Sequence, residues 1–101
     1  MIFSIIVPIY NEEKTILDIL SRLEKLKFST LKKEIIVIDD GSLDGTRKLL
    51  DSNKHLYDKL YSNNNNEGKG SAVRLGLKKS TGDYVVIQDG DLEYNPDDLI
   101  K

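Results

Sequence analysis

Short apolar runs alternate with helix-forming segments along this chain of 101 residues. Phe3 to Val7 and Glu34 to Ile38 are rich in β-branched residues and lack polar alternation, which is typical of strands covered on both faces. Weaker strands are expected around Leu60 and Tyr61 and over Tyr84 to Gln88. Strands that alternate with helices through short connections predict an α/β fold with right-handed crossovers. We therefore expect a mostly parallel sheet of about four strands with flanking helices.

The segment after Asn11 predicts the first helix. Asn11 is expected to be its N-cap, with Glu12 and Glu13 in the first turn, where carboxylates favour the positive end of the helix dipole. The apolar residues of this segment recur at helical spacing and would form one face: Ile16, Leu17, Leu20, Leu23 and Leu26. The first strand is therefore expected to be followed by a helix.

Two further helices are predicted downstream. A short one spans about Asp44 to Ser52, and another spans Ser71 to Lys79. Between them, residues 63–66 are all asparagine and are expected to form a surface loop. Gly82 follows the last helix and is predicted to close it in the left-handed conformation.

Composition excludes several classes of protein. Lys and Arg number 15 against 17 for Asp and Glu, and a net charge of −2 gives no general attraction to nucleic acid. The chain has no cysteine, which excludes disulfides and thiolate metal sites and is compatible with a reducing cytoplasm. Its apolar runs are only strand-length and no basic segment follows Met1, so we expect neither a membrane-spanning helix nor a signal peptide. A soluble, cytoplasmic chain is expected.

Polar side chains follow the predicted strands at their carboxyl ends, the edge where open α/β sheets bind ligands. They are Tyr10 and Glu12 after the first strand, Asp39 and Asp40 after the second, and Asp89 and Asp91 after the fourth. Carboxylates gathered in one crevice repel one another unless a cation or several hydrogen-bond donors offset their charge. This edge is therefore the predicted ligand site.

The acidic stretch after the fourth strand suggests a metal site. Mg²⁺ prefers carboxylate oxygens, waters and substrate phosphates, so Asp89, Asp91 and Glu93 could hold an ion that binds a diphosphate. Two aspartates separated by one residue also occur in ordinary acidic turns, and the pair alone is a weak signal. Its position at a strand end favours the metal site.

Structural interpretations stay open for several of these residues. Asp40 could belong only to a turn and helix cap, whereas Asp39 is harder to explain in that way. Lys69, which lies between two glycines, could be an ordinary solvated lysine. His55 is interpreted as a surface residue without a functional role.

Three other site types do not fit the sequence. The stretch from Asp40 begins like a calcium loop, but Arg47 occupies an apolar position and Asp51 replaces the terminal glutamate. The Gly68 to Gly70 segment lacks the residues that complete a P-loop or a dinucleotide fingerprint. A phosphoacceptor receiver would carry its acidic pair after the first strand, where this chain has Pro8 to Glu12.

Four blocks of sequence together resemble a known family. VPIYNEE, VIDDGSLDGT, NEGKGSAVRLGL and TGDYVVIQDGDLEYNPDDL occur in the order and approximate spacing seen in family 2 glycosyltransferases of the GT-A type. They are most similar to polyprenyl-phosphate glycosyltransferases such as dolichyl-phosphate mannose synthase. The resemblance implies a Rossmann-like GT-A fold and inverting transfer from a nucleotide diphosphate sugar, a hexosyltransferase activity that usually uses Mg²⁺ or Mn²⁺.

The resemblance also implies roles for individual residues of the donor site. Pro8, Tyr10 and Glu12 would contact the base and ribose, while Val37 and Asp39 would line the nucleobase pocket. A carboxylate at Asp39 can accept hydrogen bonds from guanine or uracil, and the Tyr10 ring can offer an apolar face.

The acidic motif would serve the diphosphate and the metal. Asp89 resembles a residue near ribose and metal, Gly90 lies between the two aspartates, and Asp91 resembles the principal metal ligand. Glu93 is a further candidate ligand at a position that often differs in relatives. Two basic residues would support the sheet edge or the phosphates: Lys69 and Arg74.

The resemblance finally implies that residues 1–101 are the donor-binding part of a longer domain, truncated at its C-terminal end. Asn95 and Pro96 predict the start of a helix that Lys101 leaves unfinished, and the carboxylate that deprotonates the acceptor is expected beyond Lys101. The acceptor would be a polyprenyl phosphate or a glycan, and membrane association would come from downstream segments. Exposed apolar surface predicts self-association. The alternative is a non-catalytic nucleotide-sugar binding module, or a half-domain that works with a partner chain.

Overall fold

A computed structural model of the chain describes residues 1–26 and 32–88. Four parallel strands form one sheet: β1 (Ile2–Ile9), β2 (Lys32–Asp40), β3 (Lys59–Asn63) and β4 (Tyr84–Ile87). Helices connect them: α1 (Ile16–Lys25), α2 (Thr46–Ser52), the 3₁₀ helix η1 (Lys54–Leu56) and α3 (Lys69–Lys79). The predicted parallel α/β architecture is confirmed.

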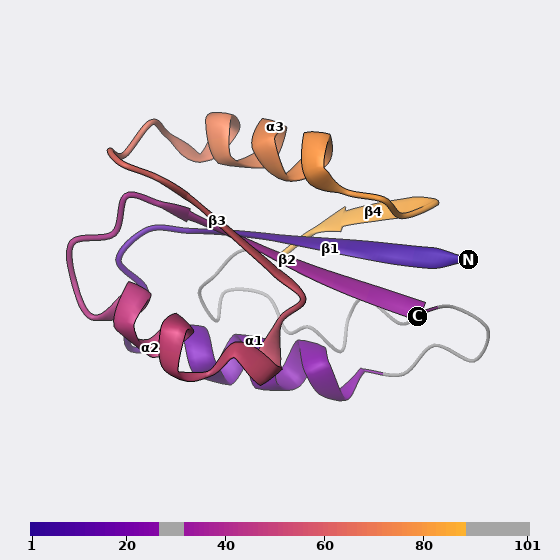
Figure 1. Cartoon of the computed structure of the whole chain (residues 1–101), viewed down its shortest axis with the longest axis horizontal. Coiled ribbons are helices and arrows are strands. Elements are labelled where there is room, and N and C mark those ends of the chain that lie inside the picture. The colour runs from indigo at the N-terminus through magenta and orange to yellow at the C-terminus, as the bar shows by residue number, and fades with distance from the viewer. Residues whose placement is uncertain (27–31, 89–101) are drawn as a thin grey trace.

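The strands lie in the order β3-β2-β1-β4. The chain therefore adds β2 and β3 on one side of β1 and then crosses back to add β4 on the other side. Parallel crossovers share one hand, and the reversal therefore moves α3 to the face opposite α1 and α2. Figure 1 shows this arrangement, with α3 on one face of the sheet and α1 and α2 on the other. The reversal also creates a switch point between β1 and β4, where ligands bind in folds of this kind.

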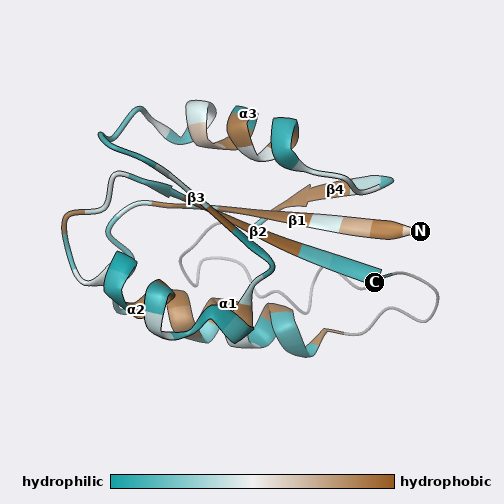
Figure 2. Cartoon of the chain, in the orientation of Figure 1, coloured by the Kyte–Doolittle hydropathy of each residue, from teal (hydrophilic) through white to brown (hydrophobic). Residues whose placement is uncertain are grey.

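Alternate residues of β1 and β2 supply the cores on the two faces. Ile5 and Val7 pack with the apolar face of α1, whereas Ile6 packs with Ile36 and with Ala72 of α3. In Figure 2 the central parts of β1 and β2 are brown, the colour of hydrophobic residues, between helices that carry teal, hydrophilic positions. Burial on both faces explains why these two strands lack polar alternation. Within residues 1–26 and 32–88, no helix combines the length and apolar character needed to cross a membrane.

The prediction that Asn11 caps the first helix is wrong. Helix α1 begins at Ile16, after Thr15, and Asn11 instead adopts a positive φ of 53°. Its side-chain oxygen accepts hydrogen bonds from the backbone of Leu43 and Asp44, in the loop that follows β2. Asparagine tolerates this left-handed conformation and bonds readily to backbone groups, so tertiary contacts use Asn11 as a bridge between loops.

The left-handed conformation predicted for Gly82 is also wrong. Helix α3 ends before Ser80, which is extended, and the positive-φ glycines of the described segments are Gly41 and Gly68. Gly82 lies against β1, where an added Cβ would be 2.8 Å from the nitrogen of Ser4 and 2.9 Å from the oxygen of Ile2. Close approach of two backbones explains this glycine.

Candidate functional site

The carboxyl ends of the strands place the loops after β1 and β2 next to each other. Ile9 is paired with Asp39, and Asp40 is paired with Asn63 at the end of β3. On the other side of β1, the backbone nitrogen of Gln88 donates to the oxygen of Ile6 at 2.9 Å. Tyr10, Glu12 and Asp39 therefore lie at the edge where the ligand site is predicted.

Asp39 and Asp40 have different surroundings although both are only 3% exposed. Successive strand residues point to opposite faces, and Asp40 reaches the loop before α3. Its carboxylate accepts hydrogen bonds from the amide of Asn63 at 2.8 Å and from the backbone nitrogens of Glu67 at 2.9 Å and Gly68 at 2.8 Å. These contacts agree with the structural interpretation of Asp40. The residue fixes the asparagine-rich loop and the start of α3.

The carboxylate of Asp39 accepts fewer hydrogen bonds from the described part of the chain than the carboxylate of Asp40 does. Its one hydrogen bond within the described part of the chain comes from the backbone nitrogen of Ser42, 3.1 Å from Oδ1. A carboxylate has about four lone-pair sites, so it can accept hydrogen bonds in addition to the one from Ser42. Asp39 is therefore suited to accept hydrogen bonds from the donor groups of a ligand.

The loops after β1 and β2 are joined by hydrogen bonds that frame Asp39. The backbone nitrogen of Asn11 donates to the hydroxyl of Ser42 at 2.9 Å, and its side-chain oxygen accepts from Leu43 at 2.8 Å. The backbone nitrogen of Glu12 donates to the hydroxyl of Thr46 at 2.9 Å. These bonds fix the loop after β1 against the loop after β2 at the predicted ligand edge.

Asp44 strengthens the same junction. Its Oδ1 accepts from the backbone nitrogen of Thr46 at 2.9 Å, and Glu13 accepts from the backbone nitrogen of Gly45 at 3.1 Å. Partial desolvation raises the pKa of Asp44, but hydrogen bonds from Thr46 and from the backbone of Glu13 outweigh it and leave the pKa below its ordinary value. The carboxylate is thus ionised in its role as acceptor near neutral pH.

The other predicted donor-site residues differ in exposure. Tyr10 is 38% exposed at the edge and can present its ring, whereas Pro8 is buried. Glu12 is half-buried, and its Oε2 accepts from the hydroxyl of Thr15 at 3.0 Å. The Val37 side chain is fully buried in the core against α1, so its place in a nucleobase pocket stays a prediction.

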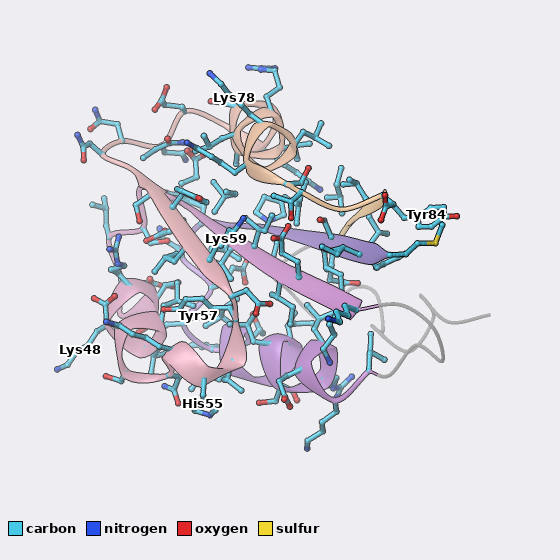
Figure 3. The ribbon with its side chains drawn as sticks, turned by 45° about the vertical axis from the view of Figure 1, so that its right-hand side comes forward. Lys48, His55, Tyr57, Lys59, Lys78 and Tyr84 are labelled. Atoms are coloured by element: carbon cyan, nitrogen blue, oxygen red, sulfur yellow. The ribbon has the colours of Figure 1, made fainter. Side chains whose placement is uncertain are left out.

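The predicted basic residues lie on α3. Lys69 is the first residue of that helix, directly after the Gly68 that Asp40 holds, and it is exposed. Arg74 is exposed further along the helix. His55 lies on η1 at the surface, between α2 and β3 and away from the carboxyl edge (Figure 3).

The acidic motif lies outside the described residues, as does the helix predicted to start at Asn95 and Pro96: Asp89, Gly90, Asp91 and Glu93 all follow Gln88. Within the described ranges, no group of three or more His, Cys, Asp or Glu residues could hold a metal ion. The motif's three carboxylates are the oxygen donors that Mg²⁺ and Mn²⁺ prefer. β4 runs parallel to β1, so its carboxyl end lies at the predicted edge, and a metal site formed by the residues that follow it stays a prediction.

Sequence reasoning missed the residues that join the two loops, above all Asn11, Ser42 and Thr46. Asparagine, serine and threonine just after a strand commonly bond to nearby backbone groups. Local rules placed Asn11 at a helix cap and Thr46 within a helix, and they could not identify partners that lie more than thirty positions away along the chain.

A parallel sheet with a strand-order reversal and polar side chains at its carboxyl edge is the arrangement in which open α/β domains bind their ligands. The family model described as "Glycosyl transferase family 2" matches residues 4–101. The chain belongs to glycosyl transferase family 2, which confirms the resemblance inferred from its four sequence blocks.

Named relatives agree with this assignment. The chain is 32% identical to the undecaprenyl-phosphate 4-deoxy-4-formamido-L-arabinose transferase of Proteus mirabilis, over 95% of this chain and 31% of that enzyme. It spans 43%, 31% and 20% of the lengths of three curated relatives that it matches.

Solved structures show the same fold. S. aureus TarS 1-349 in complex with UDP-GlcNAc superposes with a TM-score of 0.80 and 33% identity, over 90% of this chain and 27% of that chain. The mannosyltransferase PcManGT from Pyrobaculum calidifontis, in complex with GDP-Man and Mn²⁺, has a TM-score of 0.70 and 30% identity over 88% and 27% of the two chains. The fold is therefore that of the GT-A nucleotide-sugar transferases.

Proposed function

We propose that this chain forms the donor-binding side of a glycosyltransferase that takes a sugar from a nucleotide diphosphate sugar with the help of a divalent metal ion. The observation that carries the proposal is the buried carboxylate of Asp39 at the carboxyl edge, beside loops held rigid by Asn11 and Thr46. The relatives bound to UDP-GlcNAc and to GDP-Man with Mn²⁺ support it.

In the proposed complex, Asp39 accepts hydrogen bonds from the base and the exposed ring of Tyr10 contacts its face. Glu12 contacts the ribose, while the buried Pro8 and Val37 shape the strand ends beneath. The carboxylate of the neighbouring Asp40 already accepts hydrogen bonds from Asn63, Glu67 and Gly68. Of the two aspartates, only Asp39 therefore recognises the base.

The residues that would hold Mg²⁺ or Mn²⁺ are Asp91, Asp89 and Glu93, with Gly90 between the aspartates. A bound divalent ion supplies positive charge for the diphosphate leaving group. Lys69 and Arg74, on the exposed surface of α3, would add positive charge or support near the same edge.

The proposed acceptor is a polyprenyl phosphate or a glycan at the cytoplasmic face of a membrane, and the sugar is a hexose transferred with inversion. None of the residues assigned above is a base for the acceptor hydroxyl. We therefore propose that the 101 residues bind donor without turnover. We propose that self-association occurs through the exposed apolar residues of β4, which are Tyr84, Val85 and Ile87.

Asp39→Ala should weaken GDP or UDP binding at least about tenfold, because a hydrogen bond to a charged group contributes on the order of 1.5–3 kcal/mol. Inorganic pyrophosphate carries no base and should bind as before. Isothermal titration calorimetry with all three ligands measures the difference, and Asp18→Ala, an exposed aspartate on α1, is the matched control. Equal losses for nucleotide and pyrophosphate would contradict base recognition by Asp39 and indicate a damaged edge.

Asp91→Asn should remove most of the Mn²⁺ dependence of GDP, UDP and pyrophosphate binding, because an amide is a far weaker metal ligand than a carboxylate. Calorimetry with and without Mn²⁺ measures it, and circular dichroism establishes that the variant is folded. Asp51→Asn, an exposed aspartate on α2, serves as control. A folded Asp91→Asn chain with undiminished Mn²⁺ dependence would make the motif an ordinary acidic turn.

A further inference from the structure

A polar junction lies at the amino edge of the sheet, opposite the proposed donor site. Its centre is Glu34 of β2, whose side chain is 13% exposed. Oε1 accepts from the hydroxyl of Ser4 at 2.9 Å and the backbone nitrogen of Thr81 at 3.1 Å. Oε2 accepts from the hydroxyl of Thr81 at 2.9 Å and forms an ion pair with Lys59 at 3.1 Å. One carboxylate thus joins β1, β2, β3 and the turn before β4.

Ser4 extends this junction to the start of β4. Its hydroxyl is buried and accepts from the backbone nitrogen of Gly82 at 2.9 Å. The next residue, Asp83, donates its backbone nitrogen to the oxygen of Ile2 at 2.7 Å and accepts from the nitrogen of Ile2 at 2.9 Å. The turn from Thr81 to Asp83 is therefore held against β1 by Glu34, through Ser4, and by direct backbone contact.

β4 itself has little packing to hold it in place. It contains four residues, of which Tyr84, Val85 and Ile87 are 50%, 40% and 43% exposed. Figure 3 shows Tyr84 at the outer side of β4, projecting away from the sheet. A strand with few buried side chains has low local stability, so its position depends strongly on pairing with β1 and on the anchored turn.

We propose that Glu34 is a positioning residue for the metal-binding half of the donor site, because it fixes the strand that leads into the acidic motif. The inference rests on the proposed function, since in the sequence β4 is followed by Gln88 and then by Asp89 and Asp91. Asp39 lies near the end of β2, at the opposite edge of the sheet, where the backbone nitrogen of Ser42 donates to its carboxylate. Glu34 therefore acts on metal-dependent diphosphate binding and leaves base recognition unchanged.

The ionised form of Glu34 is the one that this junction requires, because every described partner of the carboxylate is a donor. Desolvation raises the pKa of Glu34, but hydrogen bonds from Thr81, Lys59 and Ser4 outweigh it and hold the pKa below the ordinary value of 4.5. The stabilisation is thus fully present above pH 4.5 and is lost as the pH falls through the folded-state pKa.

Charged groups near the junction are few among the described residues. Lys59 forms the ion pair, and its ammonium also lies 3.5 Å from the backbone oxygen of Lys79. The ammonium of Lys79 lies 5.2 Å from the centre of the Tyr61 ring. Asp83 faces the backbone nitrogen of Ile2. Lys59 is therefore the charged side chain whose interaction changes most when Glu34 takes up a proton.

The test is Glu34→Gln in the 101-residue chain, with Glu24→Gln, an exposed residue of α1, as control. Amide hydrogen exchange of residues 84–87 should accelerate at least about tenfold while β1 and β2 stay protected. Mn²⁺-dependent binding of pyrophosphate should weaken at least about tenfold, and the ratio of nucleotide to pyrophosphate affinity should stay constant. In the unmodified chain, the protection of the β4 amides relative to their intrinsic exchange rates should fall as the pH drops below 4.5, and this pH response should be absent from Glu34→Gln.

Two results would overturn the proposal: unchanged β4 exchange in folded Glu34→Gln, or equal loss of protection in β4, β1 and β2, which would make Glu34 a global stabiliser. If Glu34→Gln does not fold, Thr81→Ala decides, because it removes one hydroxyl bond and keeps the backbone bond. Faster exchange confined to β4 supports the proposal, and unchanged exchange rejects it. If the unmodified chain binds no nucleotide, the proposed function fails, while the exchange data still decide whether Glu34 fixes β4.

Discussion

Gly41→Ala is expected to destabilise the chain by about 2–5 kcal/mol, because the alanine incurs both a backbone and a steric cost. Gly41 has a φ of 76°, where a Cβ is unfavourable. That Cβ would lie 2.5 Å from the carbonyl carbon of Asn65 and 2.7 Å from the nitrogen of Asn66. Both are backbone atoms of a loop that Asp40 holds at its two ends, so the loop cannot move away without breaking those hydrogen bonds.

Urea unfolding followed by circular dichroism measures this loss. Gly68→Ala is the matched control, because Gly68 has a φ of 99° but nothing within 4 Å of an added Cβ, so only the backbone cost remains. Gly70→Ala, inside α3, should be neutral or stabilising by up to about 1 kcal/mol. A loss below about 1 kcal/mol for Gly41→Ala would show that the asparagine loop yields easily and that the proposed fixed edge is wrong.

Leu20→Ala should cost about 2–5 kcal/mol, a large part of the 5–15 kcal/mol typical of a small domain. Leu20 is fully buried on the face of α1 that packs against β1 and β2. Alanine favours the helix as well as leucine does, so the loss comes from burial and from the cavity left behind. The transition midpoint in urea should fall with little change in slope.

Leu43→Ala removes the same atoms from a side chain that is 85% exposed, and its effect should stay within about 0.5 kcal/mol. The two variants together separate burial from residue type. Similar small losses for both would mean that α1 is not packed on the sheet as described.

Much of the fold was predictable because its signals are local. The β-branched runs of β1 and β2, the helical spacing from Ile16 to Leu23 and the short connections between them determine the element types. Once the elements are known, parallel pairing gathers their carboxyl ends at one edge. Tyr10, Glu12 and Asp39 were therefore predicted at the correct edge from their positions alone. Their roles in donor binding stay predictions.

The failures occurred where long-range contacts override a local preference. Asn11 and Gly82 both stand where local rules predict a helix cap, yet each is held by a segment more than thirty positions away. Glu34 gave no signal at all, because a glutamate at the start of a strand is common on protein surfaces. Its partners at Ser4, Lys59 and Thr81 come together only when the sheet is assembled.

The sequence by itself determined the α/β class, the glycosyltransferase family and the edge at which the polar residues gather, because strand and helix periodicity and four ordered motifs are properties of the chain alone. The sequence and the family resemblance favoured Asp39 over Asp40 as a binding residue, but only the tertiary structure gave the physical reason for the difference. The two aspartates are adjacent in sequence and equally buried, but the alternation of strand side chains sends them to opposite faces. Asn63, Glu67 and Gly68, at the end of β3 and before α3, supply three donors to Asp40 on one face. Among the described residues, Asp39 receives one hydrogen bond, from Ser42, and its carboxylate can accept more from a ligand.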